Sequence, residues 1–399
     1  MSTTRKTKLV KRVLFASELG SNLGHVVPLS IVAKKLKLNQ IQPIFASSNL
    51  EPVSIALNNT DIPFIQAPVW PSWHVLDGNQ DGQSGYLDVL AQIGFADPNK
   101  LATIMLAWKE LLKLVKPDLV ILDHSPALSS LLNALGTPAI ALGSGFTLPP
   151  IDYDFFPAYR TDRTPLVPEK KLLRSLTQAL EQLGFPPPIN LISSIFPKDR
   201  FVCSFPELDY YKNWRREKLY LPLEQLTKDC QTPRTVRLFV YLGAELPGFE
   251  EVIKCLAEID CEVECYLRGA PDSINTFLNM RGHKVYKTPP DLTKLLPRIS
   301  HVLSQGGNGI CHSVMAAGRP HFIIPLHGES EFNLNELMKI NVARRIPINL
   351  KAKELKKTLE EYIADHELHD RASQWASLVN TRKQENSLDA VLSKIFTII

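Results

Sequence analysis

The sequence predicts an α/β protein with two doubly wound, Rossmann-like domains that face each other across a cleft. Short runs rich in β-branched residues alternate with stretches of helical spacing along almost the whole chain, a pattern typical of parallel sheets covered by helices. The length of 399 residues suits two or three domains of about 150 residues each. A polar stretch at residues 226–234 separates two groups of alternating segments, which predicts a linker. Ligands commonly bind between such domains.

The N-terminal half is expected to carry one parallel sheet with helices between its strands. A helix over residues 28–38 is indicated by Pro28 in its first turn and by apolar residues at helical spacing. A second helix over 101–114 should end before Lys116-Pro117, because a residue that precedes proline disfavours the helical conformation. The expected strands are 13–16, 43–46, 119–122 and 139–142.

The C-terminal half shows the same alternation. A short helix at 310–317 should end at Gly318, which can adopt a left-handed conformation, and Pro320 prevents it from continuing. A charged helix fits residues 351–366, and one last helix fits 369–392. The expected strands are 238–242, 262–267, 301–303 and 322–324.

Composition and charge exclude several classes of protein. With 44% hydrophobic and 22% charged residues the chain is typical of soluble globular proteins. A net charge of +4 is too small for a dedicated nucleic-acid binder. No apolar run reaches the roughly 18 residues of a transmembrane helix and no signal-peptide core follows the start, so we expect a cytoplasmic protein. The basic residues between 5 and 12 are interpreted as a solvated start, with peripheral contact to an anionic membrane as the alternative.

The cysteines do not predict a metal site. Cys255, Cys261 and Cys265 follow a spacing that matches no zinc pattern. We interpret all six cysteines as reduced core thiols of a cytoplasmic protein. No metal is expected at the histidines either, because they lack close ligand spacing.

A glycine-rich loop between a strand and a helix is the most informative segment. Gly306, Gly307 and Gly309 follow the strand that ends at Leu303. Such glycines let backbone N–H groups approach an anion at the positive end of a helix, which is how proteins bind phosphate. The loop is neither a G-x-G-x-x-G motif nor a P-loop. From the residues alone, a tight turn that binds nothing is an equally good interpretation.

The stretch from Ser304 to Asn333 resembles the nucleotide-sugar signature of family-1 glycosyltransferases of the GT-B fold. The closest resemblance is to the bacterial group related to macrolide, flavonoid and carotenoid glycosyltransferases. The likeness extends to Gly24-His25-Val26-Val27-Pro28 and to Leu295-Leu296-Pro297, and it covers most of the chain in order. The signature residues found in register are Gly307, Gly318, Pro320, Pro325, Glu329 and Asn333.

This resemblance implies a GT-B fold with an N-terminal acceptor-binding domain (1–225), a linker (226–234) and a C-terminal nucleotide-sugar domain (235–368). Residues 369–399 would then form a final helix packed back on the N-terminal domain. The implied reaction is metal-independent, inverting transfer of a hexose from a UDP- or dTDP-sugar to a hydroxyl of an apolar small molecule. The nucleotide sugar is a co-substrate, and no cofactor is implied. The alternative is a non-catalytic GT-B homologue that binds a ligand or assists a partner enzyme.

Several donor-site positions depart from the family pattern. Gln305 stands where the family has a diphosphate-binding histidine, and Ser313 stands where it has a ribose-binding glutamate. Ser330 replaces a sugar-reading glutamine, and Ala244 replaces the serine of a Gly-Ser turn. These departures fit either an altered donor, such as a dTDP- or deoxy-sugar, or a homologue that has lost turnover. The donor-binding residues that the resemblance implies are Gly243, Ala244, Gln305, Gly306, Gly307, Asn308, Gly309, Ser313, Glu329, Ser330 and Asn333.

His25 and Asp123 are the candidate catalytic residues. His25 follows the first strand through a loop with Gly20 and Gly24, at the sheet edge where α/β proteins bind ligands. Histidine suits the removal of a proton from an acceptor hydroxyl, and a carboxylate can orient it. Asp123 ends the strand at 119–122 and matches the family's partner aspartate, whereas Asp118 lies at the opposite edge. Without the resemblance, His25 is better interpreted as a capping or packing histidine.

Aromatic, proline-rich segments in the N-terminal half are candidates for an acceptor pocket. They are 69–74 and 146–159, and neither shows a helical or strand period. Loops held by a rigid sheet often carry recognition. Ordinary packing under long loops is an equally good interpretation for each residue. The candidate pocket residues are Trp70, Trp73, His124 and Phe146, with Glu18 as a further possibility.

Overall fold

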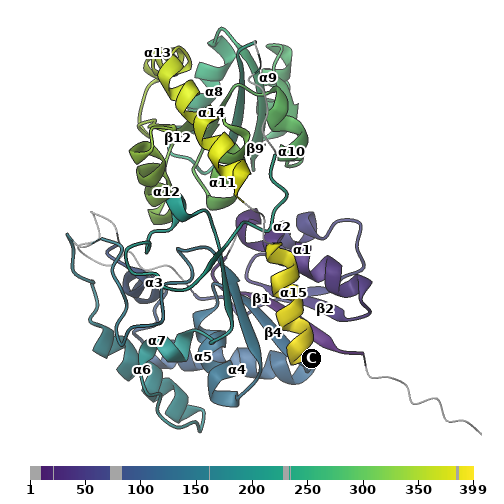
Figure 1. Ribbon diagram of the computed structural model, residues 1–399, viewed down its shortest axis with the longest axis vertical. Coiled ribbons are helices and arrows are strands. Elements are labelled where there is room, and N and C mark those ends of the chain that lie inside the picture. The colour runs from purple at the N-terminus through teal and green to yellow at the C-terminus, as the bar shows by residue number, and fades with distance from the viewer. Residues whose placement is uncertain are drawn as a thin grey trace, which may run out of the picture. The chain divides into compact units, whose positions relative to one another are not determined.

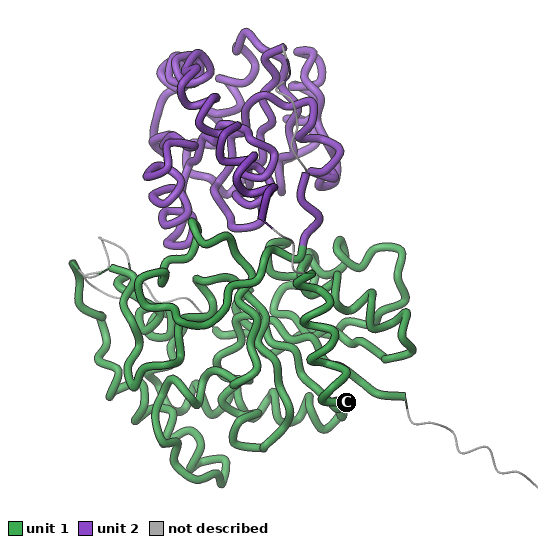
Figure 2. Tube along the Cα trace, in the orientation of Figure 1, with its two compact units in different colours: residues 1–223, 385–399 green, residues 224–384 purple. Residues whose placement is uncertain are grey.

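The structure is a computed structural model that describes residues 10–20, 22–71, 83–160, 162–227, 233, 235–382 and 386–399. It divides into two compact units, shown in different colours in Figure 2. Unit 1 comprises Met1–Leu223 and Glu385–Ile399, and unit 2 comprises Glu224–Gln384. Each unit is built around one parallel sheet with helices on both faces (Figure 1). The predicted α/β class and its two doubly wound domains are therefore confirmed.

The sheet of unit 1 contains seven strands among the described residues, in the order β3-β2-β1-β4-β5-β6-β7. Its order reverses between β1 and β4, which pair in register with Ser17 opposite Asp123. Such a switch point is where open α/β sheets bind ligands, at the carboxyl ends of the strands. The strands are β1 (Arg12–Ser17), β2 (Gln42–Ser47), β3 (Phe64–Gln66), β4 (Leu119–Asp123), β5 (Ala139–Gly143), β6 (Arg200–Cys203) and β7 (Leu219–Tyr220).

Both faces of this sheet are buried, as a parallel sheet covered by helices requires. Leu14 and Val120 face one hydrophobic cluster, whereas Phe15 and Ile121 face the other. The flanking helices are α1 (Leu23–Leu38), α2 (Leu50–Ala56), α3 (Tyr86–Gln92), α4 (Pro98–Val115), α5 (Pro126–Leu135), α6 (Glu169–Gln182), α7 (Leu191–Ile195) and α15 (Ser387–Ile398).

Helix α1 begins earlier than the sequence predicted. It starts at Leu23, so that Pro28 lies inside the helix and His25 lies in its first turn. Helix α4 ends as expected, with Lys116 in a left-handed conformation (φ 50°) before Pro117. The early start of α1 places His25 within the helix, so the helix fixes its backbone.

The sheet of unit 2 contains six strands among the described residues, in the order β10-β9-β8-β11-β12-β13, and its switch point lies between β8 and β11. Its strands are β8 (Arg237–Gly243), β9 (Glu262–Arg268), β10 (Lys284–Tyr286), β11 (His301–Ser304), β12 (His321–Ile323) and β13 (Ala343–Arg345). Its helices are α8 (Phe249–Glu258), α9 (Asp272–Met280), α10 (Leu292–Leu295), α11 (Asn308–Ala317), α12 (Gly328–Lys339), α13 (Ala352–Ile363) and α14 (His366–Thr381).

The single last helix expected at 369–392 is wrong, because two helices take its place. Arg382 is extended and ends α14, which packs on α11 of unit 2. Asn386 then caps a new helix, since its side chain accepts a hydrogen bond from the backbone N–H of Asp389. This second helix, α15, packs on α1 of unit 1 and places Val391 and Ile395 in its core.

Candidate active site

His25 and Asp123 meet at the switch point of unit 1. Nδ1 of His25 lies 2.8 Å from Oδ2 of Asp123, and the side chains are 19% and 4% exposed. A carboxylate can only accept a hydrogen bond, so Nδ1 carries the proton and donates it. In the neutral imidazole, Nε2 is then the nitrogen without a proton. The ring is therefore held in the tautomer that a general base needs.

Gly20 makes this close approach possible. A Cβ atom at Gly20 would lie 2.6 Å from Cγ of His25, 2.6 Å from Oγ of Ser17 and 2.7 Å from Oδ2 of Asp123. The hydroxyl of Ser17 donates to the carbonyl of Gly20 at 3.0 Å and lies 3.4 Å from the Asp123 carboxylate. The missing side chain thus leaves the room that the histidine–aspartate pair fills.

Glu18 is a buried carboxylate in the same loop, and its partners could not be predicted from the sequence. It accepts hydrogen bonds from Nε1 of Trp70 at 2.7 Å and from the backbone N–H groups of Ala127 and Leu128 at 3.3 and 3.0 Å. These N–H groups lie in the first turn of α5, where a carboxylate is favoured by the helix dipole. Burial nevertheless dominates and raises the pKa of Glu18 to about 7. Trp70 is itself buried, so its indole anchors this loop.

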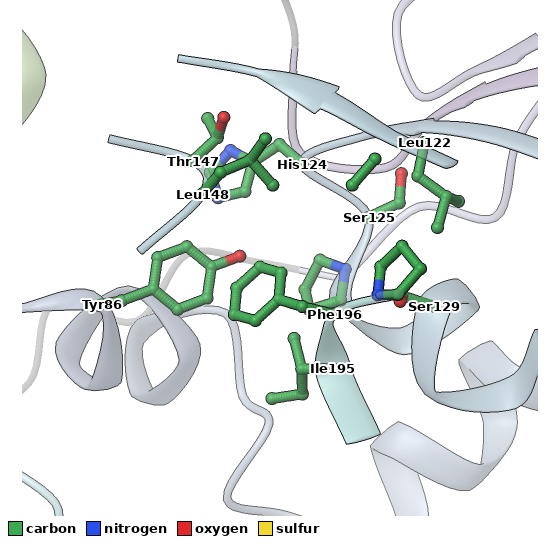
Figure 3. A pocket seen from close by; sticks show the side chains of 12 residues that line it. Tyr86, Leu122, His124, Ser125, Ser129, Thr147, Leu148, Ile195 and Phe196 are labelled. Atoms are coloured by element: carbon green, nitrogen blue, oxygen red, sulfur yellow. The ribbon is translucent and has the colours of Figure 1, made fainter. Parts of the chain in front are cut away.

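His124 directly follows Asp123 and lines a small pocket (Figure 3). Its backbone is left-handed (φ 43°), a strained conformation that is uncommon for a residue with a side chain. Its ring lies 6.2 Å from the His25 ring, and Phe146 packs edge-on against it at 6.2 Å. Burial, and secondarily the nearby His25, lower the pKa of His124 to about 3. The ring is therefore neutral at physiological pH.

The pocket has a volume of about 10 Å³, close to the space that one water molecule needs. The polar lining residues are Tyr86, His124, Ser125, Ser129 and Thr147, and the other lining residues are apolar (Figure 3). Nε2 of His124 and Oγ of Ser129 have no hydrogen-bond partner within the described part of the chain. Phe146 and Trp70 do not line this pocket, and Trp73 lies outside the described residues.

In unit 2, the loop Gln305-Gly306-Gly307 joins β11 to α11. Gly306 has a φ of 76°, and a Cβ there would lie 2.6 Å from Cγ2 of Ile323, so this position requires glycine. A Cβ at Gly307 would meet nothing within 4 Å, which leaves that side of the loop open. The first N–H groups of α11, from Asn308 and Gly309 onward, have no partner inside the helix. Nε2 of Gln305 is buried and has no partner among the described residues.

Other predicted donor-site residues hold the loop and its neighbours in place. The buried amide of Asn333 donates to the carbonyl of Gly306 at 2.9 Å. The hydroxyl of Ser330 accepts from the backbone N–H of His327 at 3.1 Å and caps α12. The hydroxyl of Ser313 donates to the carbonyl of Gly309 within α11, and the N–H of Ala244 donates to the carbonyl of Arg268. These polar atoms are therefore already engaged within unit 2.

Glu329 lies half-buried in the first turn of α12. Burial, and secondarily the Glu329 carboxylate, raise the pKa of Cys311 on the neighbouring helix α11.

The five described cysteines are free thiols, whereas Cys230 lies outside the described residues. Across the residues that the structure describes, no group of three or more metal-ligating side chains occurs. No helix in the same part of the chain is long and apolar enough to cross a membrane.

Comparison with known proteins identifies the fold. No family model and no curated protein matches the sequence. Among solved structures, the chain is similar to CalG4, the calicheamicin glycosyltransferase, at 18% identity over 98% of each chain, with a TM-score of 0.66. It is also similar to the Streptomyces sp. SF2575 glycosyltransferase SsfS6 in complex with thymidine diphosphate, at 16% identity over 96% of this chain and 99% of that one, with a TM-score of 0.60.

The spinosyn rhamnosyltransferase SpnG, solved with spinosyn aglycone, matches at 11% identity over 95% of this chain and 99% of its own, with a TM-score of 0.64. These likenesses span nearly the whole of each chain and include both parallel sheets. The chain therefore has the two-domain GT-B fold of these glycosyltransferases.

Proposed function

We propose that the protein is an inverting glycosyltransferase that moves a hexose from a UDP- or dTDP-sugar to a hydroxyl of an apolar small molecule. The observation that carries this proposal is the pair of His25 and Asp123 at the switch point of unit 1, with Nδ1 and Oδ2 2.8 Å apart. The pairing leaves Nε2 of His25 as the base. The structural neighbours support the proposal, because they are glycosyltransferases, one of them bound to thymidine diphosphate and another to an aglycone.

In the proposed reaction, Nε2 of His25 takes the proton of the acceptor hydroxyl while the oxygen attacks the anomeric carbon of the sugar. The bond between this carbon and the diphosphate oxygen breaks, and the nucleoside diphosphate leaves with the electron pair. Asp123 stabilises the imidazolium that forms. Attack from the side opposite the leaving group inverts the configuration at the anomeric carbon.

Unit 2 would hold the donor through the glycine loop. Backbone N–H groups of Gly307, Asn308 and Gly309 can point at the diphosphate, and the dipole of α11 favours negative charge at this end. Nε2 of Gln305 adds a buried donor that lacks a partner among the described residues. Glu329 would accept hydrogen bonds from sugar hydroxyls. In this proposal the backbone N–H groups, the dipole of α11 and the Gln305 amide stabilise the charge of the leaving diphosphate, and no divalent ion takes part.

A non-catalytic, ligand-binding homologue is the second candidate. It is favoured by Ser313 and Ser330. The Ser313 hydroxyl donates its proton to the Gly309 carbonyl and has only acceptor capacity left, and the Ser330 hydroxyl both accepts and donates within the cap of α12. The two candidates share the nucleotide site and differ in turnover.

A thermal-shift panel of UDP, dTDP, GDP and their common sugars tests the shared site. A nucleotide at 100 times its Kd should stabilise the protein by about 2.7 kcal/mol. The matching nucleoside without phosphate should have a much smaller effect.

A proton NMR assay with the nucleotide sugar that binds and a panel of phenolic and aliphatic alcohols then tests transfer. An α-linked donor should give a β-linked product; a retained configuration contradicts the mechanism, and binding without transfer to any acceptor favours the second candidate.

A further inference from the structure

An ion pair lies at the carboxyl edge of the unit 2 sheet, beside the glycine loop. Arg268 is the last residue of β9 and pairs in register with Gly243, the last residue of β8. Glu245 follows β8 by two residues, and its carboxylate forms a salt bridge with the Arg268 guanidinium. The carboxylate also folds back over Gly243, so closely that a Cβ atom there would overlap it.

This position adjoins the loop that would bind phosphate. Strand β8 pairs with β11, with Tyr241 opposite Ser304, so the end of β8 lies next to Gln305 and Gly306. Neighbouring strands are about 4.8 Å apart, which brings the edge of β8 within reach of a diphosphate on the loop. His327, on the far side of β11, also feels the charges of both Glu245 and Arg268. The carboxylate of Glu245 therefore lies close to the glycine loop and to Arg268, the groups that would attract an anion.

We infer that the Glu245 carboxylate takes the place of a phosphate at this edge of unit 2, and that a nucleoside diphosphate displaces it from Arg268. The inference rests on the proposed function, because it assigns two further residues to the donor site. Arg268 is then a diphosphate-binding residue, and Glu245 is a competing anion built into the chain. Neither residue was predicted from the sequence.

Two physical arguments make the exchange favourable. Both side chains of the pair are partly exposed, at 38% for Arg268 and 48% for Glu245, and exposed ion pairs are weak. A diphosphate carries more charge than a carboxylate and can accept two parallel hydrogen bonds from a guanidinium. Arg268 would also supply the formal charge that the neutral side chain of Gln305 lacks.

Isothermal titration of the full chain with dTDP, UDP and inorganic pyrophosphate tests the inference. Glu245→Gln removes the competing charge and should tighten binding about threefold to tenfold, more at low salt than at high salt. Arg268→Met should weaken binding about tenfold or more. The double variant should bind no more tightly than Arg268→Met alone. Both residues would act on the phosphate groups and not on the base. The affinity for pyrophosphate should therefore change in the same direction in each variant.

A matched control is provided by the opposite edge of the same two strands. Arg237 and Glu262 start β8 and β9, pair in register and form an ion pair there. Glu262→Gln should leave all three affinities unchanged. The inference is overturned when the wild type binds a nucleoside diphosphate and Glu245→Gln and Arg268→Met bind it equally well. If neither the wild type nor Glu245→Gln binds any of the three ligands, the proposed donor site itself is refuted, and this inference falls with it.

Discussion

Replacing Gly20 by alanine should separate His25 from Asp123 without altering the charge of either. The backbone at Gly20 does not adopt a positive φ, so only the added methyl group matters. Its carbon would lie 2.6 Å from Cγ of His25 and 2.7 Å from Oδ2 of Asp123. Since van der Waals contact begins at about 3.5 Å, one or both side chains must move by close to 1 Å.

The consequences for catalysis and stability differ in size. A misplacement of about 1 Å in a catalytic group lowers the rate by roughly 100-fold. Overpacking of a buried site typically lowers the free energy of unfolding by about 1–3 kcal/mol. The Kd for the nucleotide should not change, because the glycine loop belongs to unit 2.

Gly24→Ala is the matched control in the same segment. A Cβ at Gly24 meets nothing within 4 Å, and the residue lies in the first turn of α1, where alanine is favoured by up to about 1 kcal/mol. Both variants are assayed for sugar transfer, for nucleotide affinity and for the NMR signal of the His25 Nδ1 proton. Equal transfer rates in Gly20→Ala and Gly24→Ala, with an unchanged proton signal, would refute the reasoning.

Two further predictions concern buried polar groups. The folded-state pKa of Glu18 is about 7, against 4.5 for the free side chain, so the contribution of Glu18 to stability should be complete below pH 4.5 and be lost as the pH rises through 7. Glu18→Gln should remove about 3 kcal/mol of this dependence in denaturant titrations between pH 4.5 and 8, and an unchanged pH profile contradicts the assignment. Asn333→Ala removes the hydrogen bond to the Gly306 carbonyl and should lower the free energy of unfolding by about 1–3 kcal/mol and weaken nucleotide binding. Asn335→Ala, on the same helix but half-buried, should do neither, and equal effects of the two variants would show that the loop does not depend on Asn333.

The positions of the main chain were largely predictable from the sequence. Parallel strands have their carboxyl ends at a common edge of the sheet. The strand pattern therefore predicts that the loops after β1 and β4 lie close together, as they do. The glycine loop was predictable for a similar reason, because Gly306 needs a positive φ and Gly318 ends α11 in the left-handed conformation. A positive φ favours glycine, so glycine in the sequence directly indicates such backbone positions.

The direction of individual side chains was not predictable. Asn333 matched the signature, yet its amide is turned inward onto the Gly306 carbonyl. Glu18 finds Trp70 and the start of α5, which lie 52 and about 110 residues away in the chain. The ion pair of Glu245 and Arg268 joins residues from the ends of two different strands. Such contacts depend on packing between distant segments, which no local pattern encodes.

Replacing His25 by alanine tests most directly whether this residue is the base of the proposed sugar transfer. His25→Ala should abolish sugar transfer while the Kd for the nucleoside diphosphate stays at its wild-type value. Asp118→Asn is the control, because this residue precedes β4 at the opposite edge and binds the backbone of Arg12, and it should leave transfer intact. Transfer at an undiminished rate in His25→Ala, or loss of transfer and nucleotide binding together, would contradict the assignment of His25 as the base.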